Sequence, residues 1–122
     1  AESELLVLVL EDEAGVRQTL CEQLHQLGYL TLEAENGEQA LNMLDASPDI
    51  GMFISDLMLP GGLSGAEVID HVRSHYPQLP VLLISGQDLR PAHNPQLPEV
   101  QLLRKPFTRA QLAQALRKVM VI

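Results

Sequence analysis

The sequence predicts one doubly wound α/β domain, with a five-stranded parallel sheet and helices on both of its faces. Short continuous apolar runs recur along the chain, as in strands that are buried on both faces of a sheet. Segments with apolar residues at helical spacing lie between these runs. Strands that alternate with helices favour parallel pairing through right-handed crossovers. Because no linker or repeat interrupts the 122 residues, we expect a single domain over residues 1–122.

Five apolar runs are predicted as the strands of this sheet. The strongest three are continuous and lie at Leu5–Leu10, Ile50–Ile54 and Val81–Ile84. Two weaker runs, Tyr29–Leu32 and Val100–Leu103, supply the remaining strands.

Four segments are predicted as helices from the spacing of their apolar residues. The apolar faces consist of Val16, Leu20, Leu24 and Leu27; of Ala40, Leu41 and Leu44; of Val68, Ile69 and Val72; and of Leu112, Leu116 and Val119. The last three also have capping patterns at their starts: Asn36 with Gln39, Ser64 with Glu67, and Thr108 with Gln111.

The segment Gln87–Pro98 departs from this alternation. Pro91, Pro95 and Pro98 interrupt it, and proline inside a helix costs about 3 kcal/mol. We therefore expect the helix between the last two strands to be short, irregular or absent.

Composition excludes several classes of protein. A net charge of -8 argues against direct nucleic-acid binding, because no basic cluster is available to neutralise phosphates. No run of about 20 apolar residues suits a membrane span, and no signal peptide is recognisable. The single Cys21 favours a core role in a reducing, cytoplasmic setting. The chain starts at Ala1, so we expect a processed protein or a piece of a longer one.

Polar residues follow four of the predicted strands at their carboxyl ends. Glu11-Asp12-Glu13 follows the first strand, Asp56 the third, Ser85 the fourth and Lys105 the fifth. In open parallel sheets, ligands bind beyond the carboxyl ends of the strands. The sequence therefore predicts a functional site at this end of the sheet.

The acids at this end suit a magnesium ion. Carboxylates about 4 Å apart repel by about 1 to 4 kcal/mol per pair, which favours protonation or a bound cation. An all-oxygen cluster without His or Cys is typical of Mg²⁺. Alternatively, residues 11–13 only begin a helix, where acids interact favourably with the helix dipole.

Asp56 is a plausible nucleophile that would accept a phosphoryl group and form an acyl phosphate. Lys105 and Mg²⁺ would offset the charge on the transferred oxygens, and the Ser85 hydroxyl would donate to one of them. A solvated surface lysine and a plain Ser85-Gly86 turn are the structural alternatives.

The motifs resemble those of response-regulator receiver domains over nearly the whole chain. Glu11-Asp12-Glu13 follows VLVL, Leu57-Met58-Leu59-Pro60 and then Gly65 follow Asp56, Ser85 follows VLLI, and Lys105 is followed by Pro106-Phe107. The resemblance implies a flavodoxin-like sheet with strand order 2-1-3-4-5.

The same resemblance implies roles for individual residues. Asp56 would take a phosphoryl group from the phosphohistidine of a sensor histidine kinase or a histidine phosphotransfer domain. Mg²⁺ would be held by Glu11, Asp12, Asp56 and the backbone carbonyl of Met58. Ser85 and Lys105 would bind phosphoryl oxygens, with a cis Lys105–Pro106 bond, and residues such as Met58 and Gln87 would tune hydrolysis. The domain itself would catalyse both transfer and slow hydrolysis, and the chain would be part of a hybrid histidine kinase or a larger regulator.

Two departures from the family pattern lie near the surface that commonly signals onward. Leu102 occupies the place of an aromatic residue whose inward swing accompanies switching, and Pro98-Glu99 stands where the family usually has Gly-Ala. Both bear on the conformational switch rather than on the phosphorylation chemistry.

Three other functions remain alternatives. An aspartyl-phosphate hydrolase of the haloacid-dehalogenase kind would need a second Asp where Met58 stands. An FMN-binding flavodoxin would need a phosphate-cradling loop in place of Glu11-Asp12-Glu13. A docking-only pseudo-receiver would lack Asp56 or Lys105, and both are present.

Overall fold

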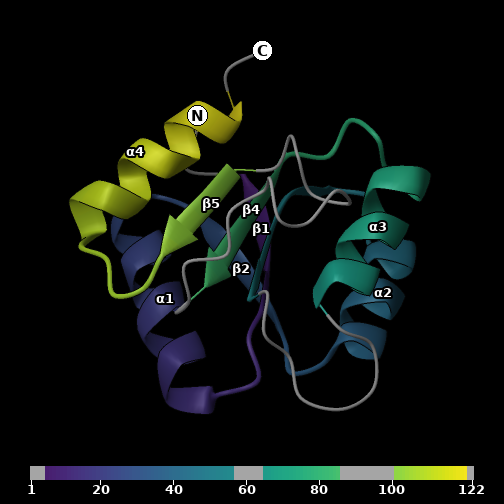
Figure 1. Cartoon of the computed structure of the whole chain (residues 1–122), viewed down its shortest axis with the longest axis horizontal. Helices are drawn as coiled ribbons and strands as arrows, with labels where there is room; N and C mark the ends of the chain where they lie inside the picture. Colours follow the sequence, from purple (N-terminus) through teal and green to yellow (C-terminus); the bar gives the residue numbers. More distant parts are fainter. Residues whose placement is uncertain (1–4, 57–64, 86–100, 121–122) are drawn as a thin grey trace.

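Five parallel strands form a single sheet in the order β2-β1-β3-β4-β5 in a computed structural model, which describes residues 5–56, 65–85 and 101–120 (Figure 1). The strands are β1 (Leu6–Leu10), β2 (Leu30–Ala34), β3 (Ile50–Asp56), β4 (Val81–Ser85) and β5 (Gln101–Arg104). The described helices are α1 (Ala14–Gln26), α2 (Gly37–Ala46), α3 (Gly65–His75) and α4 (Arg109–Met120). The predicted fold class and strand order are confirmed.

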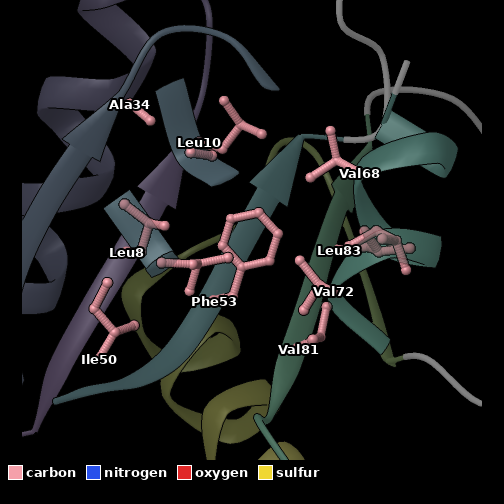
Figure 2. Packing of buried hydrophobic residues seen from close by; sticks show 12 residues of the cluster. Leu8, Leu10, Ala34, Ile50, Phe53, Val68, Val72, Val81 and Leu83 are labelled. Atoms are coloured by element: carbon pink, nitrogen blue, oxygen red, sulfur yellow. The ribbon is translucent and has the colours of Figure 1, made fainter. Parts of the chain in front are cut away.

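Helices cover both faces of the sheet. In Figure 1, α1 and α4 lie on one side of the strands, and α2 and α3 lie on the other. Two buried clusters match this arrangement, because one joins the sheet to Leu20 of α1 and Leu112 of α4, and the other joins it to Leu44 of α2 and Val72 of α3. Figure 2 shows Phe53 of β3 in the second cluster, among side chains from the neighbouring strands.

Four of the five strands extend further toward their carboxyl ends than their apolar runs predict, and β1 ends at Leu10 as predicted. β3 continues through Ser55 and Asp56, which pair with Leu83 and Ile84 of β4. The apolar run stops earlier because these side chains are polar, whereas the backbone pairing depends on the neighbouring strand. Asp56 is therefore part of the sheet.

Two of the predicted helix caps are confirmed. The Asn36 side chain accepts a hydrogen bond from the Gln39 N–H at 2.8 Å. At the start of α4, Thr108 Oγ1 accepts from the Gln111 N–H at 3.1 Å, and Gln111 Oε1 accepts from the Thr108 N–H at 2.8 Å. The third predicted cap, at Ser64, and the proline-rich segment Gln87–Pro98 lie outside the described residues.

Cys21 is buried in the cluster beside α1, and burial raises the pKa of its thiol. This confirms its predicted core position. Of the helices in the described parts of the chain, none has the length and apolar character of a bilayer-spanning segment.

Candidate functional site

The predicted site residues meet at the carboxyl end of the sheet. β1 and β3 are neighbours, although β2 follows β1 along the chain, so the strand order reverses between them. Crevices at such reversals are where open α/β sheets bind ligands. Glu11 directly follows β1 and Asp56 ends β3, so both carboxylates lie at this crevice.

Lys105 connects the two carboxylates. Its Nζ donates to Glu11 Oε1 at 3.0 Å and to Asp56 Oδ2 at 3.1 Å. Its backbone N–H donates to the carbonyl oxygen of Ser85 at 2.7 Å, and the Lys105–Pro106 peptide bond is cis as expected. Lys105, which follows β5, thus connects to the ends of β1 and β3 through its ammonium group and to the end of β4 through its backbone.

Both carboxylates are removed from solvent. Glu11 is 2% exposed and Asp56 is 6% exposed, whereas the Lys105 side chain is 25% exposed. Burial is the largest influence on Glu11 and raises the pKa of its carboxyl group; the negative charge of Asp56 acts in the same direction. The Glu13 N–H, which donates to Glu11 Oε2 at 3.1 Å, and Lys105 oppose this rise.

The ammonium group is held in its charged form by the same contacts. Burial is the largest single influence on Lys105 and disfavours the charge. Hydrogen bonds to Glu11 and Asp56, together with the negative charges of these carboxylates, outweigh burial, so the pKa of Lys105 is raised. Lys105 is therefore a stable positive charge beside Asp56, in agreement with its predicted place over the sheet end.

The acidic cluster has the chemistry that a magnesium ion requires. Glu11, Asp12 and Asp56 each place a carboxylate oxygen within 4.8 Å of the other two. Mg²⁺ binds oxygen at about 2.1 Å, so oxygens on opposite sides of one ion lie about 4.2 Å apart. Oxygens on adjacent sides of the octahedron lie only about 3.0 Å apart, so the three carboxylates would have to draw closer together around an ion. The exposure of Asp12 leaves a path for the ion and its waters.

The alternative interpretation, that these acids only begin a helix and interact with its dipole, fits the position of Glu13 alone. Glu13 is the N-cap residue of α1, but its side chain makes no capping hydrogen bond. The first turn of α1 contains no acidic residue.

Of the other residues predicted in or near the site, the structure describes Ser85 and Leu102. Ser85 is fully buried at the last position of β4, next to Lys105. Met58 and Gln87 lie outside the described residues. Leu102 pairs with Leu83 across β5 and β4 and is partly buried against the cluster under α2 and α3, so the position of the usual aromatic residue is filled by an aliphatic side chain.

Arg17 belongs to the site region but was not predicted. Its Nη1 donates to the Glu11 carbonyl oxygen at 2.8 Å, and its Nε donates to Glu33 Oε1 at 2.9 Å. One signal was available, because Arg17 is the only Lys or Arg among the first 72 residues and closely follows the acidic triplet. Its pairing with Glu33 of β2 depends on the position of β2 in the sheet.

A pocket of about 470 Å³ opens beside the site, between α1 and the segment after β5. Val16, Leu20 and Phe107 give it apolar walls, and Glu11 and Lys105 line it as well. A side chain from another molecule can therefore approach Lys105 from the α1 side.

Comparisons with known sequences agree with the family resemblance of the site motifs. Residues 7–117 match the family described as the response regulator receiver domain. The phosphate regulon transcriptional regulatory protein PhoB of Escherichia coli (strain K12) is 32% identical over 118 residues, covering 93% of this chain and 51% of PhoB. A putative NtrX-like response regulator of Rickettsia typhi is 30% identical over 119 residues, covering 95% of this chain and 25% of that protein. The chain thus spans about half the length, or less, of these curated relatives.

Solved structures give the same result. The response regulator protein TrrA of Thermotoga maritima, in complex with Mg²⁺-BeF, matches with a TM-score of 0.87 and 26% identity, covering 96% of this chain and 100% of that chain. The chemotaxis response regulator CheY4 of Vibrio cholerae matches with a TM-score of 0.84 and 26% identity, covering 95% and 98% of the two chains.

Proposed function

Because the chain belongs to the response regulator receiver family, we propose that Asp56 is its phosphoryl acceptor in two-component or phosphorelay signalling. The observation that supports this assignment most directly is the position of Lys105, whose ammonium group bridges Asp56 and Glu11 at the reversal point of the sheet. A buried carboxylate with a cation in contact has both the nucleophile and the charge compensation that phosphoryl transfer requires.

In the proposed reaction, an Asp56 carboxylate oxygen forms a bond to phosphorus as the P–N bond of a phosphohistidine breaks. The leaving imidazole nitrogen takes up a proton, and Asp56 becomes an acyl phosphate. Lys105 would then exchange its contact with the Asp56 oxygen for one with a phosphoryl oxygen. Ser85, buried at the end of β4, would donate a hydrogen bond to another phosphoryl oxygen.

Receiver domains bind Mg²⁺ at an acidic pocket, and this chain has such a cluster. We assign the ion to Glu11, Asp12 and Asp56, with the Met58 carbonyl as a further ligand from the family pattern. When bound, Mg²⁺ would offset negative charge on the phosphoryl oxygens during transfer. Glu11 has lone pairs left for this role, because its two oxygens each accept one hydrogen bond, from Lys105 and from Glu13.

The proposed donor is a sensor histidine kinase or a histidine phosphotransfer domain, since receiver domains are phosphorylated by histidine kinases. The chain spans half or less of relatives such as PhoB. We therefore propose that it works as one module of a larger regulator or a hybrid kinase, in a cytoplasmic setting, and that any DNA-binding activity belongs to other domains.

Intact mass after incubation with acetyl phosphate, with and without Mg²⁺, tests the proposal. Wild-type protein is expected to gain one phosphoryl group only when Mg²⁺ is present, and Asp56→Asn is expected to gain none. Asp70→Asn is the matched control, because Asp70 is an exposed acid on α3. Labelling of Asp56→Asn at another acid would contradict the assignment. No labelling of any variant, by acetyl phosphate or by a phosphorylated histidine phosphotransfer domain, would favour a docking-only role.

A further inference from the structure

Arg17 lies at the junction of three elements beside the acidic cluster. It belongs to the first turns of α1, where its N–H donates to the Glu13 carbonyl at 2.9 Å. Its side chain is only 12% exposed and reaches toward the ends of β1 and β2. A charged side chain with so little exposure needs hydrogen-bond partners, and Arg17 has two, in Glu11 and Glu33.

The two hydrogen bonds of Arg17 join the end of β1 to β2. Nη1 donates to the Glu11 carbonyl at 2.8 Å, and Nε donates to Glu33 Oε1 at 2.9 Å. The guanidinium group is planar and rigid, so two bonds from it fix the relative positions of their acceptors. Lysine cannot reproduce this, because its single ammonium group acts as a point charge.

The Glu11 carbonyl matters because it belongs to the peptide group that leads into Asp12. A peptide group is planar, so the direction of this carbonyl sets the direction in which the chain continues to Asp12. The paired register of β1 ends at Leu10. Beyond it, the Glu11 N–H donates to the Ala34 carbonyl at 3.1 Å, and Arg17 supplies a donor to the Glu11 carbonyl. Both peptide groups of Glu11 are thus held.

Glu33 determines the electrostatic effect of this arrangement. It offsets the charge of Arg17, so the guanidinium group can hold the Glu11 carbonyl without adding a full positive charge next to the acidic cluster. Lys105 is already in contact with two of the acids. An unpaired second cation would compete with a bound metal ion.

We propose that Arg17 is a positioning residue that holds the Glu11–Asp12 peptide in the orientation needed for Mg²⁺ binding. This inference rests on the proposed Mg²⁺ site at Glu11, Asp12 and Asp56. It differs from a purely structural tether in one respect: loss of Arg17 weakens Mg²⁺ binding by folded protein and does more than lower its stability.

Isothermal titration of Mg²⁺ into Arg17→Ala, Arg17→Lys and wild-type protein tests the inference, with circular dichroism to establish that each variant is folded. Residues that orient metal ligands typically contribute 10- to 100-fold to affinity, so we expect Mg²⁺ binding to Arg17→Ala to weaken by about 10- to 100-fold and to Arg17→Lys by a smaller factor. Arg109→Ala is the matched control, because Arg109 also tethers two elements, donating from α4 to Gln26 Oε1 at 2.6 Å at the far end of α1. Its Mg²⁺ affinity should stay within about twofold of wild type.

The outcomes separate the inference from the function on which it rests. Weakened Mg²⁺ binding in both Arg17 variants, with Arg109→Ala unchanged, supports the positioning role. Wild-type affinity in folded Arg17→Lys and Arg17→Ala, even with a lower melting temperature, overturns it while leaving the proposed Mg²⁺ site intact. Absence of Mg²⁺ binding in wild-type protein overturns both. If Arg17→Ala does not fold, Arg17→Lys alone decides, since it keeps the charge and most of the side chain.

Discussion

The middle of β3 and its carboxyl end are both buried, but the middle carries apolar side chains and the end carries a charged one. Phe53, in the middle of β3, is fully buried among apolar side chains (Figure 2), and Asp56 ends the same strand with 6% exposure. Burying an apolar side chain stabilises a fold by about 1.5 to 3 kcal/mol, whereas a buried ion pair is weak evidence of stability because desolvation offsets attraction. β3 therefore supports stability through its apolar middle and carries the proposed phosphoryl acceptor at its end.

The largest expected effect is on the apolar side of this comparison. Phe53→Ala should lower the free energy of unfolding by about 3 to 5 kcal/mol, because it removes a large buried side chain and leaves a cavity. Urea unfolding followed by circular dichroism measures the change. Leu30→Ala is the control, since Leu30 is 53% exposed on β2 and its loss should stay within about 0.5 kcal/mol. A small loss for Phe53→Ala would mean that the middle of the sheet is not the stabilising region.

At the carboxyl end, Lys105→Met should affect both chemistry and stability. Removing a preorganised charge from the reacting centre should slow phosphorylation by acetyl phosphate by about 100- to 1000-fold. It should also destabilise the fold by about 1 to 3 kcal/mol, less than for a fully buried pair, because the Lys105 side chain is 25% exposed.

Time-resolved intact mass and urea unfolding measure the two effects of Lys105→Met. Lys118→Met, at an exposed position of α4, is the control for the loss of one positive charge. A second variant, Lys105→Met with Glu11→Gln, should recover part of the lost stability but none of the lost rate. If the double variant recovered both the stability and the rate, the slow phosphorylation of Lys105→Met would follow from its lower stability, and the role of Lys105 in the reaction would be contradicted.

The start of α4 offers a contribution to stability close to the site but outside its chemistry. Thr108 follows Lys105 by one short segment and shares reciprocal hydrogen bonds with Gln111. Thr108→Ala should therefore lower the free energy of unfolding by about 1 kcal/mol. The rate of phosphorylation should stay within about twofold of wild type, as measured by the same mass assay. A large loss of rate would show that this cap positions Lys105, and the site would then extend into α4.

Much of the fold and of the site could be predicted because local patterns coincide with tertiary structure here. Apolar runs and helical spacing predicted the alternation of elements, and the polar residues that end these runs predicted Asp56 and Lys105 as neighbours. Their 3.1 Å contact confirms that part of the prediction. The carboxyl limit of β3 was predicted too early, because pairing with β4 continues past the last apolar residue.

The part that could not be predicted consists of side-chain contacts between elements, because the strand order, which the family resemblance implied, does not say which side chains meet. Arg17 contacts Glu33 because β2 lies beside β1, and nothing in the local pattern around either residue indicates this pairing. Similarly, Leu102 could be recognised as replacing an aromatic residue, but its partial burial against Leu83 and the cluster beneath it follows from the packing of β5 on β4.

The smallest expected effect is the pH dependence caused by Glu11, in buffer without Mg²⁺. Burial, assisted by the charge of Asp56, raises the pKa of Glu11 in the folded protein above its ordinary value. The folded state therefore binds this proton more tightly than the unfolded chain does. The resulting stability is fully present below the unfolded pKa and is lost as the pH rises through the folded pKa.

This sign can be measured by urea unfolding of wild type and Glu11→Gln between pH 7 and pH 4.5. The free energy of unfolding of wild type, relative to that of Glu11→Gln, should rise as the pH falls, because only wild type regains a neutral side chain at this position. Glu38→Gln, at an exposed position of α2, controls for the removal of one acid. A relative stability that falls with decreasing pH would mean that Lys105 and the Glu13 N–H outweigh burial. The carboxyl end of the sheet would then stabilise the folded state through its charges. The two regions would differ in the polarity of their side chains, but both would stabilise the fold.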